Sequence, residues 1–320
     1  MPSEFDLIAR YFTRPTSHTR LGAGDDGAIV SPSPGMELVI STDMLVAGTH
    51  FLSNADPEAL GWKSLAVNVS DLAAMGAQPR WALLAVSLPE ADEAWIAGYA
   101  RGFFACASAF GVDLIGGDTT RGPMNFCISI FGEVLPGQAL LRSGATPGDE
   151  IWISGAPGRA ALGLAHLRGL CVLEEPALSG CLEALHRPQP RLALGLALVG
   201  LASAAIDVSD GLLADLGHIL DRSGVAATVH ADRLPDAAAR ACPGHPALAR
   251  QCLLAGGDDY ELVFTAPPGR HAAILDLAGR LDLPLNCIGS ITRQGTGDLT
   301  LVDAEHKPLP MPSRGFDHFA

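Results

Sequence analysis

The stretch "VISTDMLVAGTHF", residues 39–51, begins as an apolar strand and then sets Ser41, Thr42 and Asp43 in a row. The same design returns in "VDLIGGDTTRG" at residues 112–122 and in "AAIDVSDGLLADLG" at residues 204–217. Each apolar segment delivers oxygen-bearing side chains to a strand end or a loop. Because ligands of α/β proteins bind in the crevice beyond the carboxyl ends of the strands, the repetition predicts an α/β fold with oxygen donors around a ligand.

The chain is acidic and rich in apolar residues. It has 320 residues, of which 48% are hydrophobic and 18% are charged, and its net charge is −14. This length suits about two domains of ~150 residues each. Lysine occurs at Lys63 and Lys307 alone. Because neutralising the phosphates of a nucleic acid requires a basic face, we expect no nucleic acid partner.

The sequence predicts neither a membrane span nor a signal peptide. The longest apolar run, residues 192–206, is interrupted by glycines and is shorter than the ~20 residues that a span needs. The N-terminus, MPSEFDLIARYF, has no long apolar segment. The cysteines form no C-x-x-C pair, so we expect reduced thiols in a cytoplasmic protein and no structural zinc site.

Hydrophobic periodicity divides the chain into two α/β halves, separated by a loop rich in glycine and proline at residues 136–149. In the first half we expect helices at 4–13, 56–75 and 91–110, and strands at 37–42, 81–88, 112–115 and 125–134. In the second half we expect helices at 158–169, 177–187, 190–204, 212–220 and 269–281, and strands at 150–156, 226–231, 261–266, 285–291 and 299–303. The order of the strands does not follow from these patterns.

The letters GAGDDG at residues 22–27 match the dinucleotide-binding fingerprint G-x-G-x-x-G. That fingerprint needs a strand before it and a helix after it, because its glycines bring a pyrophosphate to a helix N-terminus. The flanking segments TRPTSHTRL and AIVSPSPG fit neither element. Asp25 and Asp26 would also face the anion, and two unit charges about 4 Å apart at an effective dielectric of about 20 cost ~4 kcal/mol. We therefore expect a loop that brings a carboxylate to a metal ion.

Oxygen donors that could bind a cation occur in five places: Ser41–Asp43, Val69–Asp71, Gly116–Asp118, Asp207–Asp210 and the loop with Asp26. Converging carboxylates repel one another unless a cation joins them. Magnesium prefers oxygen ligands and keeps water and substrate phosphate in its shell, so the pattern predicts a site with several magnesium ions that holds phosphates. Each aspartate taken alone also fits a turn or a helix cap. Arg142, in the loop between the halves, fits either a phosphate clamp or an ordinary surface arginine.

Eight segments resemble the thiamine-monophosphate kinase family, in the family's order and over nearly the whole chain. They are GDDGAIV, ISTDMLVAGTHF, LAVNVSDLAAMGAQP, LIGGDTTRGP, LLRSGATPGD, IDVSDGLLADLGHI, GGDDYEL and the terminal GFDHF. This family belongs to the superfamily of aminoimidazole ribonucleotide synthetase and selenophosphate synthetase. The segments STDMLVAGTHF and GGDDYEL favour the thiamine branch over its sisters.

The resemblance implies an α/β (α+β) fold of two PurM-like domains. Residues 1–136 would bind ATP and magnesium and form the interface of a homodimer, and residues 148–320 would form the C-terminal domain. The reaction would move the γ-phosphate of ATP onto thiamine monophosphate, giving thiamine diphosphate and ADP. By their place in the family's motifs, the magnesium ligands would be Asp26, Ser41, Thr42, Asp43, Asp71, Asp118, Asp207 and Asp210. The ATP contacts would be Gly117, Asp118, Arg142 and Ser209, and the substrate contacts would be His50, Asp258 and Phe316.

Two positions depart from the family's usual pattern. Asp258 stands where the family often has glutamate, and Ser313 stands where it often has an aromatic residue. Either Phe316 takes over the aromatic contact, or the contact is lost. Both departures concern thiamine recognition and not phosphate chemistry. His50 also fits a buried, hydrogen-bonded histidine.

The expected chemistry needs no general base, because the attacking phosphate oxygen is already anionic at neutral pH. Magnesium ions would cancel the repulsion between two polyanions and align them for direct in-line transfer, without a phospho-enzyme. The residues alone leave three alternative functions open. They are a sister ATP-dependent enzyme that activates an amide or a selenide, a magnesium-dependent phosphohydrolase, and a non-catalytic nucleotide-binding scaffold.

Overall fold

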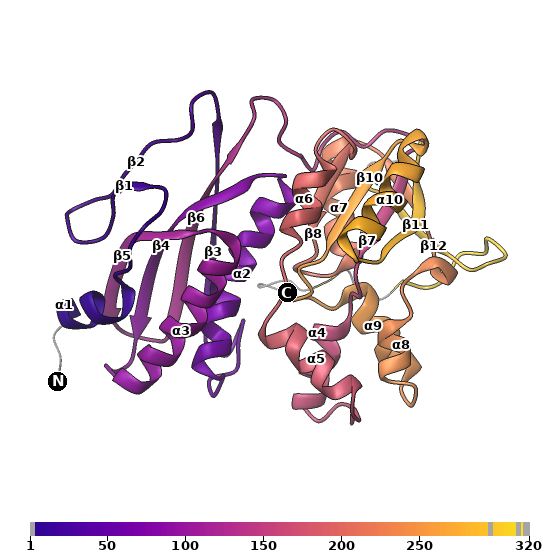
Figure 1. Cartoon of the computed structure of the whole chain (residues 1–320). Helices are drawn as coiled ribbons and strands as arrows, with labels where there is room; N and C mark the ends of the chain where they lie inside the picture. The colour runs from indigo at the N-terminus through magenta and orange to yellow at the C-terminus, as the bar shows by residue number, and fades with distance from the viewer. Residues whose placement is uncertain (1–3, 294–296, 312–314, 316–320) are drawn as a thin grey trace. The chain divides into compact units, whose positions relative to one another are not determined.

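The computed structural model of the protein describes residues 4–293, 297–311 and 315. Contacts divide the chain into two compact units, each with its own main sheet (Figure 1). Unit 1 comprises Met1–Leu72 and Ala77–Gly137, and unit 2 comprises Ala73–Gly76 and Gln138–Ala320. No helix in the described ranges is both long and apolar enough to cross a membrane.

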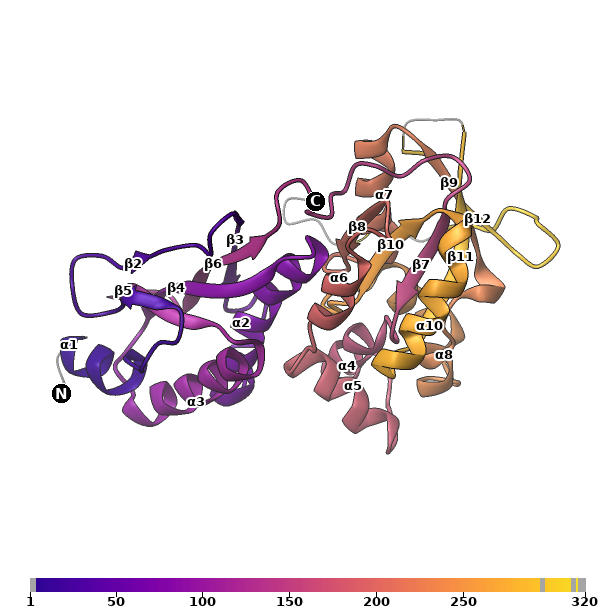
Figure 2. The same ribbon diagram turned by 45° about the horizontal axis from the view of Figure 1, so that its top comes forward.

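Unit 1 is a four-stranded sheet with two helices on one face. The strands follow the order β3, β6, β4, β5; the β4–β5 pair is parallel and the other two pairs are antiparallel. Their bounds are β3 (Glu37–Val46), β6 (Asn125–Val134), β4 (Gln78–Leu88) and β5 (Asp113–Arg121). Helices α2 (Pro57–Ala74) and α3 (Glu93–Phe110) lie on the same side of this sheet (Figure 2). The chain before them forms α1 (Glu4–Leu7), a π-helical turn (Ile8–Phe12) and the short pair β1 (Thr19–Leu21) and β2 (Ile29–Val30).

Successive side chains along each strand point to opposite faces of this sheet, and the helices cover only one of the two faces. In β6 every second side chain, from Phe126 to Ile130, is fully buried. Phe126 stacks on Tyr99 of α3 with ring centroids 4.5 Å apart, so these residues point toward the helices. On the opposite face, β3 leaves three apolar side chains 41%, 61% and 55% exposed: Leu38, Ile40 and Met44.

Two glycines allow α2 and α3 to pack closely. A Cβ atom on Gly102 would lie 1.7 Å from the backbone oxygen of Glu58, and one on Gly61 would lie 2.0 Å from the backbone oxygen of Tyr99. These contacts join backbone to backbone, so no side-chain rotation can relieve them. The two helices can therefore approach this closely only with glycine at the crossing.

Unit 2 is built on a six-stranded sheet in the order β12, β9, β11, β7, β10, β8. The bounds are β7 (Glu150–Ser154), β8 (Ala204–Asp207), β9 (Ala226–His230), β10 (Leu262–Ala266), β11 (Leu285–Thr292) and β12 (Leu299–Val302). The β12–β9 pair is parallel and the other pairs are antiparallel.

The helices of unit 2 cover both faces of its sheet. On one face α7 (Leu212–Ser223) packs into a core with Ile153, Ile206 and Val263. On the other face α6 (Leu192–Leu198) and α10 (His271–Leu281) pack against Trp152 and Phe264. A third apolar cluster joins the remaining helices, which are α4 (Arg159–Leu167), α5 (Ala177–His186), α8 (Ala237–Ala241) and α9 (Pro246–Ala255).

The expected elements are largely confirmed, with one error and several omissions. The helix expected at 190–204 is wrong in its second half, because α6 ends at Leu198 and β8 begins at Ala204. Between them Gly200 adopts a φ of 77°, which lies in the left-handed region and ends the helix. The whole run is apolar, so its periodicity could not separate a helix from a buried strand. The sequence also gave no sign of α8, α9 or the β1–β2 pair.

We predict that Gly102→Ala destabilises the protein by about 3 kcal/mol, the upper end of the usual cost of overpacking a core, because α2 and α3 must move apart. Urea unfolding followed by circular dichroism measures the change. Gly217→Ala in α7 is the matched control, since a Cβ there meets nothing within 4 Å and should stabilise the helix slightly. Equal stability of the two variants would show that the close crossing is not a constraint.

Candidate active site

Backbone pairing in unit 2 brings two predicted site segments together. Asp207 ends β8 and pairs with Leu262 at the start of β10. The pairing continues beyond the sheet, because the Tyr260 N–H donates to the Val208 oxygen at 2.9 Å and the Asp258 N–H donates to the Ser209 oxygen at 2.9 Å. A residue predicted to contact ATP and one predicted to contact the substrate therefore lie side by side, although they are far apart in the sequence.

Asp215, on the first turn of α7, holds the loop that carries the candidate ligands. Its Oδ2 atom accepts hydrogen bonds from the N–H groups of Ser209, Asp210 and Gly211 at 3.0, 3.0 and 3.1 Å. Burial raises the pKa of Asp215 to about 7; the Asp210 carboxylate adds to the rise and the three N–H bonds oppose it. Asp215 is not among the residues predicted from the sequence, although its place four residues after Gly211, in the helix that the loop enters, is a recognisable signal.

A buried ion pair supports the segment that carries Asp258. Glu261 is 5% exposed and accepts two hydrogen bonds from Arg191, both at 2.6 Å. It also accepts one from the Ser154 hydroxyl at 2.6 Å. A buried carboxylate with this many donors is well satisfied, so Glu261 fixes the end of β10 and does not reach toward a ligand.

The residues just before Glu261 adopt backbone conformations that side chains rarely take. Asp258 has a φ of 68° and Tyr260 a φ of 51°. The Tyr260 hydroxyl donates to Asp258 Oδ1 at 3.1 Å. Asp259 turns inward and accepts from the Gly158 N–H at 2.6 Å, and its burial raises its pKa well above the ordinary value. Left-handed non-glycine residues cluster at ligand-binding segments, which fits the predicted role of Asp258.

Two other segments that carry predicted contacts are held within unit 2. The backbone oxygen of Arg142 accepts from the Ser223 hydroxyl at 3.3 Å, which anchors the Arg142 loop to the end of α7. Gly315 lies against the candidate loop, since a Cβ atom on it would be 2.6 Å from the Asp210 oxygen. Phe316 and Ser313 lie outside the described residues.

In unit 1 the predicted ligands divide between the two faces of the sheet. The Ser41 hydroxyl donates to Asp71 Oδ2 at 2.5 Å, which links the helix-covered face of β3 to α2. Asp43 lies on this face too, two residues further along the strand. Thr42 points to the other face, where Ser129 donates to its hydroxyl at 3.1 Å.

Gly117 and Asp118 lie across the sheet from these residues. The register places Asp43, Ile128, Leu84 and Gly117 in one row. Neighbouring strands are about 4.8 Å apart, so Asp43 lies about 14 Å from the Gly117 position. A Cβ atom on Gly117 would lie 1.8 Å from the Leu84 oxygen, which explains why β5 requires glycine there. A single ion cannot bridge Asp43 and Asp118 over this distance.

His50 and Asp26 lie in loops of unit 1. His50 lies in the turn after β3, and its Nδ1 atom accepts from the Val46 N–H at 3.0 Å. In the neutral ring the proton is therefore on Nε2. Asp26 is exposed between β1 and β2. The GAGDDG segment is thus a loop between two short strands and not a strand-to-helix turn.

The expectation that each donor segment lies at a strand end or in a loop is wrong for three of them. Ser41–Asp43 lies inside β3, Gly116–Asp118 lies inside β5, and Val69–Asp71 lies inside α2. Both strands are longer than the apolar sequence predicted. Residues 43–46 of β3 still pair with β6, and residues 116–121 of β5 still pair with β4. Asp207, at the last position of β8, agrees with the expectation.

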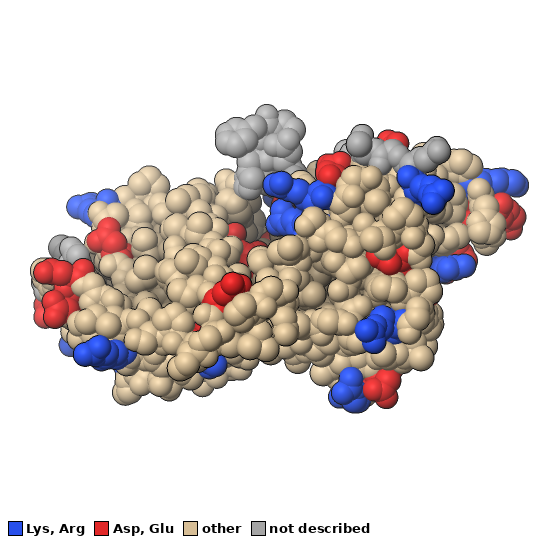
Figure 3. All heavy atoms as spheres, turned by 90° about the horizontal axis from the view of Figure 1, so that it is seen from above, with Lys and Arg blue, Asp and Glu red and all other residues tan. Residues whose placement is uncertain are grey.

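Within either unit, no three of the predicted aspartates bring their carboxylate oxygens within 4.8 Å of one another in the part of the chain that the structure describes. Among the described residues, the one group of three acidic, histidine or cysteine side chains with ligand atoms within 4.8 Å of one another contains none of them. Arginine and lysine side chains also stay dispersed: on the face drawn in Figure 3, the described basic residues form small separate groups and no continuous basic area.

Comparison with known proteins identifies the family. The model of the AIR synthase related protein N-terminal domain matches residues 24–134, and the model of its C-terminal domain matches residues 146–302. A thiamine-monophosphate kinase of Salmonella typhimurium (strain LT2) is 46% identical over 321 residues, which cover 99% of this chain and 98% of that protein. The chain belongs to the thiamine-monophosphate kinase family.

Solved structures of the family share the fold described above. The crystal structure of thiamine-monophosphate kinase from Stenotrophomonas maltophilia K279a has a TM-score of 0.83 at 46% identity, covering 92% of this chain and 94% of that one. AaThiL complexed with AMPPCP and TMP has a TM-score of 0.78 at 28% identity, covering 98% of this chain and 96% of that one. The PurM-like fold expected from the family's motifs is confirmed.

We predict that Asp215→Ala loosens the loop of this family member while Asp215→Asn preserves it. All three N–H groups donate to a single oxygen, and asparagine can supply one such acceptor. The alanine variant should lose about 1–3 kcal/mol of stability, the cost of leaving buried donors without an acceptor. Urea unfolding measures the stability, and amide hydrogen exchange at Ser209–Gly211 locates the change. Equally fast exchange in both variants would mean that the carboxylate charge, and not the hydrogen bonds, holds the loop.

Proposed function

We propose that this chain transfers the γ-phosphate of ATP to thiamine monophosphate and releases thiamine diphosphate and ADP. The observation that carries the proposal is the 46% identity to the Salmonella enzyme over nearly the full length of both chains. The complex of AaThiL with AMPPCP and TMP supports an ATP-type nucleotide and thiamine monophosphate as the pair of substrates. We assign the reaction to two domains, residues 1–136 and 148–320.

Residues on both units would take part. In unit 2, Ser209 and Arg142 would contact ATP, and Asp258 would contact the thiamine phosphate together with His50 of unit 1 and Phe316. In unit 1, Gly117 and Asp118 would also contact ATP. Because Gly117 has no side chain, the nucleotide could approach the backbone of β5. The pairing of Asp258 with Ser209 supports this assignment, because it sets a substrate contact beside an ATP contact.

Several magnesium ions fit the donor set. Hydroxyl and carboxylate oxygens are the ligands that magnesium prefers, and the close contact of Ser41 with Asp71 is of this kind. The residues that would hold the ions are Asp26, Ser41, Thr42, Asp43, Asp71, Asp118, Asp207 and Asp210. When bound, magnesium neutralises phosphate charge and favours in-line transfer. The separation of Asp43 from Asp118 supports more than one ion.

The chain's own residues would orient the reactants and would not shuttle protons. The attacking oxygen belongs to a phosphate and is already anionic, so no side chain has to act as general base. Asp215 positions the Ser209–Asp210 loop, and Tyr260 positions the Asp258 carboxylate. Both act through hydrogen bonds that exist before the substrates arrive, which lowers the cost of ordering the site.

The uncovered face of the unit 1 sheet supports a homodimer. Its apolar side chains Leu38, Ile40 and Met44 are 41–61% exposed on a single strand. Contiguous exposed apolar surface of this kind usually marks a protein interface. A second copy of the chain can cover this face with the same residues, so we propose a symmetric dimer through unit 1.

We also propose a cytoplasmic location. All seven cysteines lie in the described residues and none of them forms a disulfide. Unpaired cysteines are typical of proteins in reducing compartments, and ATP is a cytoplasmic substrate.

We predict that ADP formation depends on thiamine monophosphate when the protein is given ATP, magnesium and a panel of phosphate acceptors. Asp71→Asn should lower kcat at least about 100-fold, the scale on which one lost electrostatic contact to a transition state acts. Its fold should persist, because asparagine can still accept from Ser41. A coupled ADP assay measures turnover, and Asp276→Asn, an exposed residue on α10 paired with Arg280, is the control.

Other results of this assay would point elsewhere. ADP formation with an amide or selenide acceptor would indicate a sister enzyme, and phosphate release without ATP a phosphohydrolase. Tight ATP binding without turnover would indicate a scaffold. Covalently labelled protein from γ-labelled ATP would contradict direct transfer, and wild-type turnover of Asp71→Asn at saturating magnesium would contradict the role of Asp71.

We predict that Ile40→Glu converts the dimer to a monomer, because the carboxylate would be buried against the partner without a counter-charge. Light scattering coupled to size-exclusion chromatography measures the mass. Leu275→Glu is the control, because Leu275 on α10 is an exposed apolar side chain like Ile40, at 50% exposure. This variant should leave the mass unchanged. A wild-type monomer, or a dimer that tolerates Ile40→Glu, would exclude this face as the interface.

A further inference from the structure

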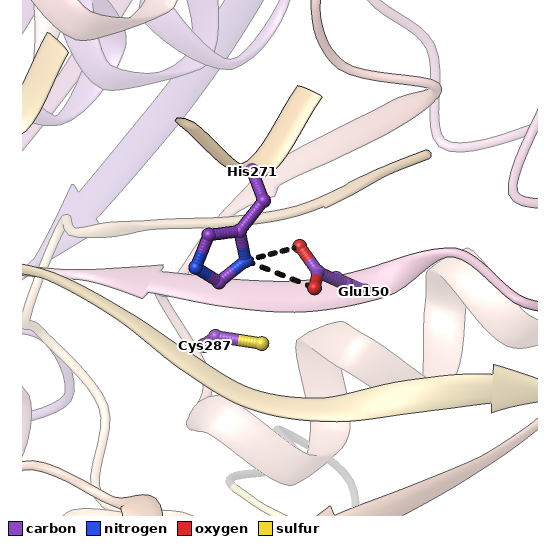
Figure 4. A group of neighbouring side chains, drawn as sticks. All are labelled: Glu150, His271 and Cys287. Atoms are coloured by element: carbon purple, nitrogen blue, oxygen red, sulfur yellow. Dashed lines mark hydrogen bonds and ion pairs between the residues drawn. The ribbon is translucent and has the colours of Figure 1, made fainter. Parts of the chain in front are cut away.

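We propose that Glu150, His271 and Cys287 form a binding site for a divalent transition-metal ion of the zinc class. The three side chains come from different elements of unit 2: the first residue of β7, the first residue of α10, and β11. Figure 4 shows all three pointing toward one another. This site is independent of the phosphate chemistry proposed above.

The sheet register puts the three residues on one face. Cys287 pairs with Trp152, and Trp152 lies on the same face of β7 as Glu150, two residues away. His271 approaches from α10, which covers this face, and its ring lies 4.9 Å from the Trp152 ring. A register shift between Cys287 and Gly289 marks a bulge in β11. Bulges commonly redirect a side chain at a functional position.

The ligand atoms are close to the spacing that a metal needs. His271 Nδ1 lies 2.9 Å from both carboxylate oxygens of Glu150, and all three ligand atoms, including the Cys287 sulfur, lie within 4.8 Å of one another. Zinc binds nitrogen and oxygen at about 2.0–2.2 Å and sulfur at about 2.3 Å. Small side-chain rotations can therefore bring all three atoms into one coordination shell.

The site is open to solvent on one side. The His271 side chain is 44% exposed and the Glu150 side chain 21%, so an ion can enter and a water molecule can fill a fourth position. A carboxylate only accepts hydrogen bonds, so His271 Nδ1 carries a proton in its contact with Glu150. Metal binding at Nδ1 would move this proton to Nε2 or to water, and would release the thiol proton of Cys287 to water. The carboxylate and thiolate charges then balance the charge of a divalent ion.

Ligand type and position separate this site from the proposed magnesium ligands. Thiolate and imidazole select zinc, cobalt or copper, whereas magnesium prefers oxygen alone. Along β10, Leu262 pairs with Asp207 and Ala266 pairs with Glu150, so the two positions lie four residues, or about 13 Å, apart along the sheet. The magnesium required for phosphate transfer should not occupy the Glu150 site.

Cobalt titration of the full-length, untagged protein tests the proposal, because a cobalt–thiolate bond gives a near-ultraviolet charge-transfer absorption. After treatment with a chelator and desalting, the wild-type protein should bind one Co²⁺ with this absorption, in the presence of excess magnesium, and Zn²⁺ should displace it. Cys287→Ser should lose the absorption. His271→Ala, at a half-exposed position, should keep the circular dichroism spectrum of the wild type and weaken cobalt binding at least about tenfold.

Cys127→Ser is the matched control, because Cys127 is also half-buried and outside any disulfide but lies in unit 1, where its sulfur contacts the Thr42 hydroxyl. It should keep the absorption, and Zn²⁺ should raise the melting temperature of this variant and of the wild type but not that of Cys287→Ser. An absorption that is absent from the wild type, or that persists in Cys287→Ser, overturns the proposal. So does removal of the absorption by magnesium.

Discussion

The antiparallel pairing of β8 with β10 is the contact on which the candidate site depends. It fixes Asp207 opposite Leu262, and the hydrogen bonds that continue past the sheet then fix Ser209 beside Asp258. Beyond the last strand residue the ladder no longer satisfies every backbone N–H group, and buried N–H groups need acceptors. Asp215 supplies one acceptor for three of them. The loop therefore keeps a fixed shape although it belongs to neither strand nor helix.

The three acidic residues of the GGDDYEL segment show how environment separates like side chains. Glu261 is buried and paired with Arg191, Asp259 is turned inward onto the N–H group of Gly158, and Asp258 has the left-handed backbone and the contact with Tyr260. Removing one partner of a buried ion pair leaves an uncompensated charge, so Glu261 and Arg191 depend on each other. Two of the three acids thus support the backbone, and the position of Asp258 fits the substrate contact proposed for it.

The sequence predicted the fold class, most elements and the motif positions, because long apolar periods and family segments are local signals. It could not predict the strand order, which depends on contacts between distant segments. It also mistook the end of the 190–204 run, where a buried strand and a buried helix have the same composition. Asp215 was missed because an aspartate within the first turn of a helix usually interacts with that helix's own N-terminus and not with the loop before it. Cysteine spacing likewise gave no hint of the Glu150, His271 and Cys287 group, since each ligand comes from a different element.

The distance between acidic residues decides how strongly their carboxylates repel one another before a cation binds. Two carboxylates about 4 Å apart repel by ~4 kcal/mol at an effective dielectric of about 20, whereas the same charges about 14 Å apart repel by ~1 kcal/mol. The register keeps Asp43 and Asp118 at roughly the larger distance. Where an acid does approach another, as Asp215 approaches Asp210, burial first and the Asp210 carboxylate second raise the pKa of Asp215 to about 7. In a chain with a net charge of −14, the larger distance keeps the repulsion between the Asp43 and Asp118 carboxylates low, and more than one ion would suit the spacing of these two residues.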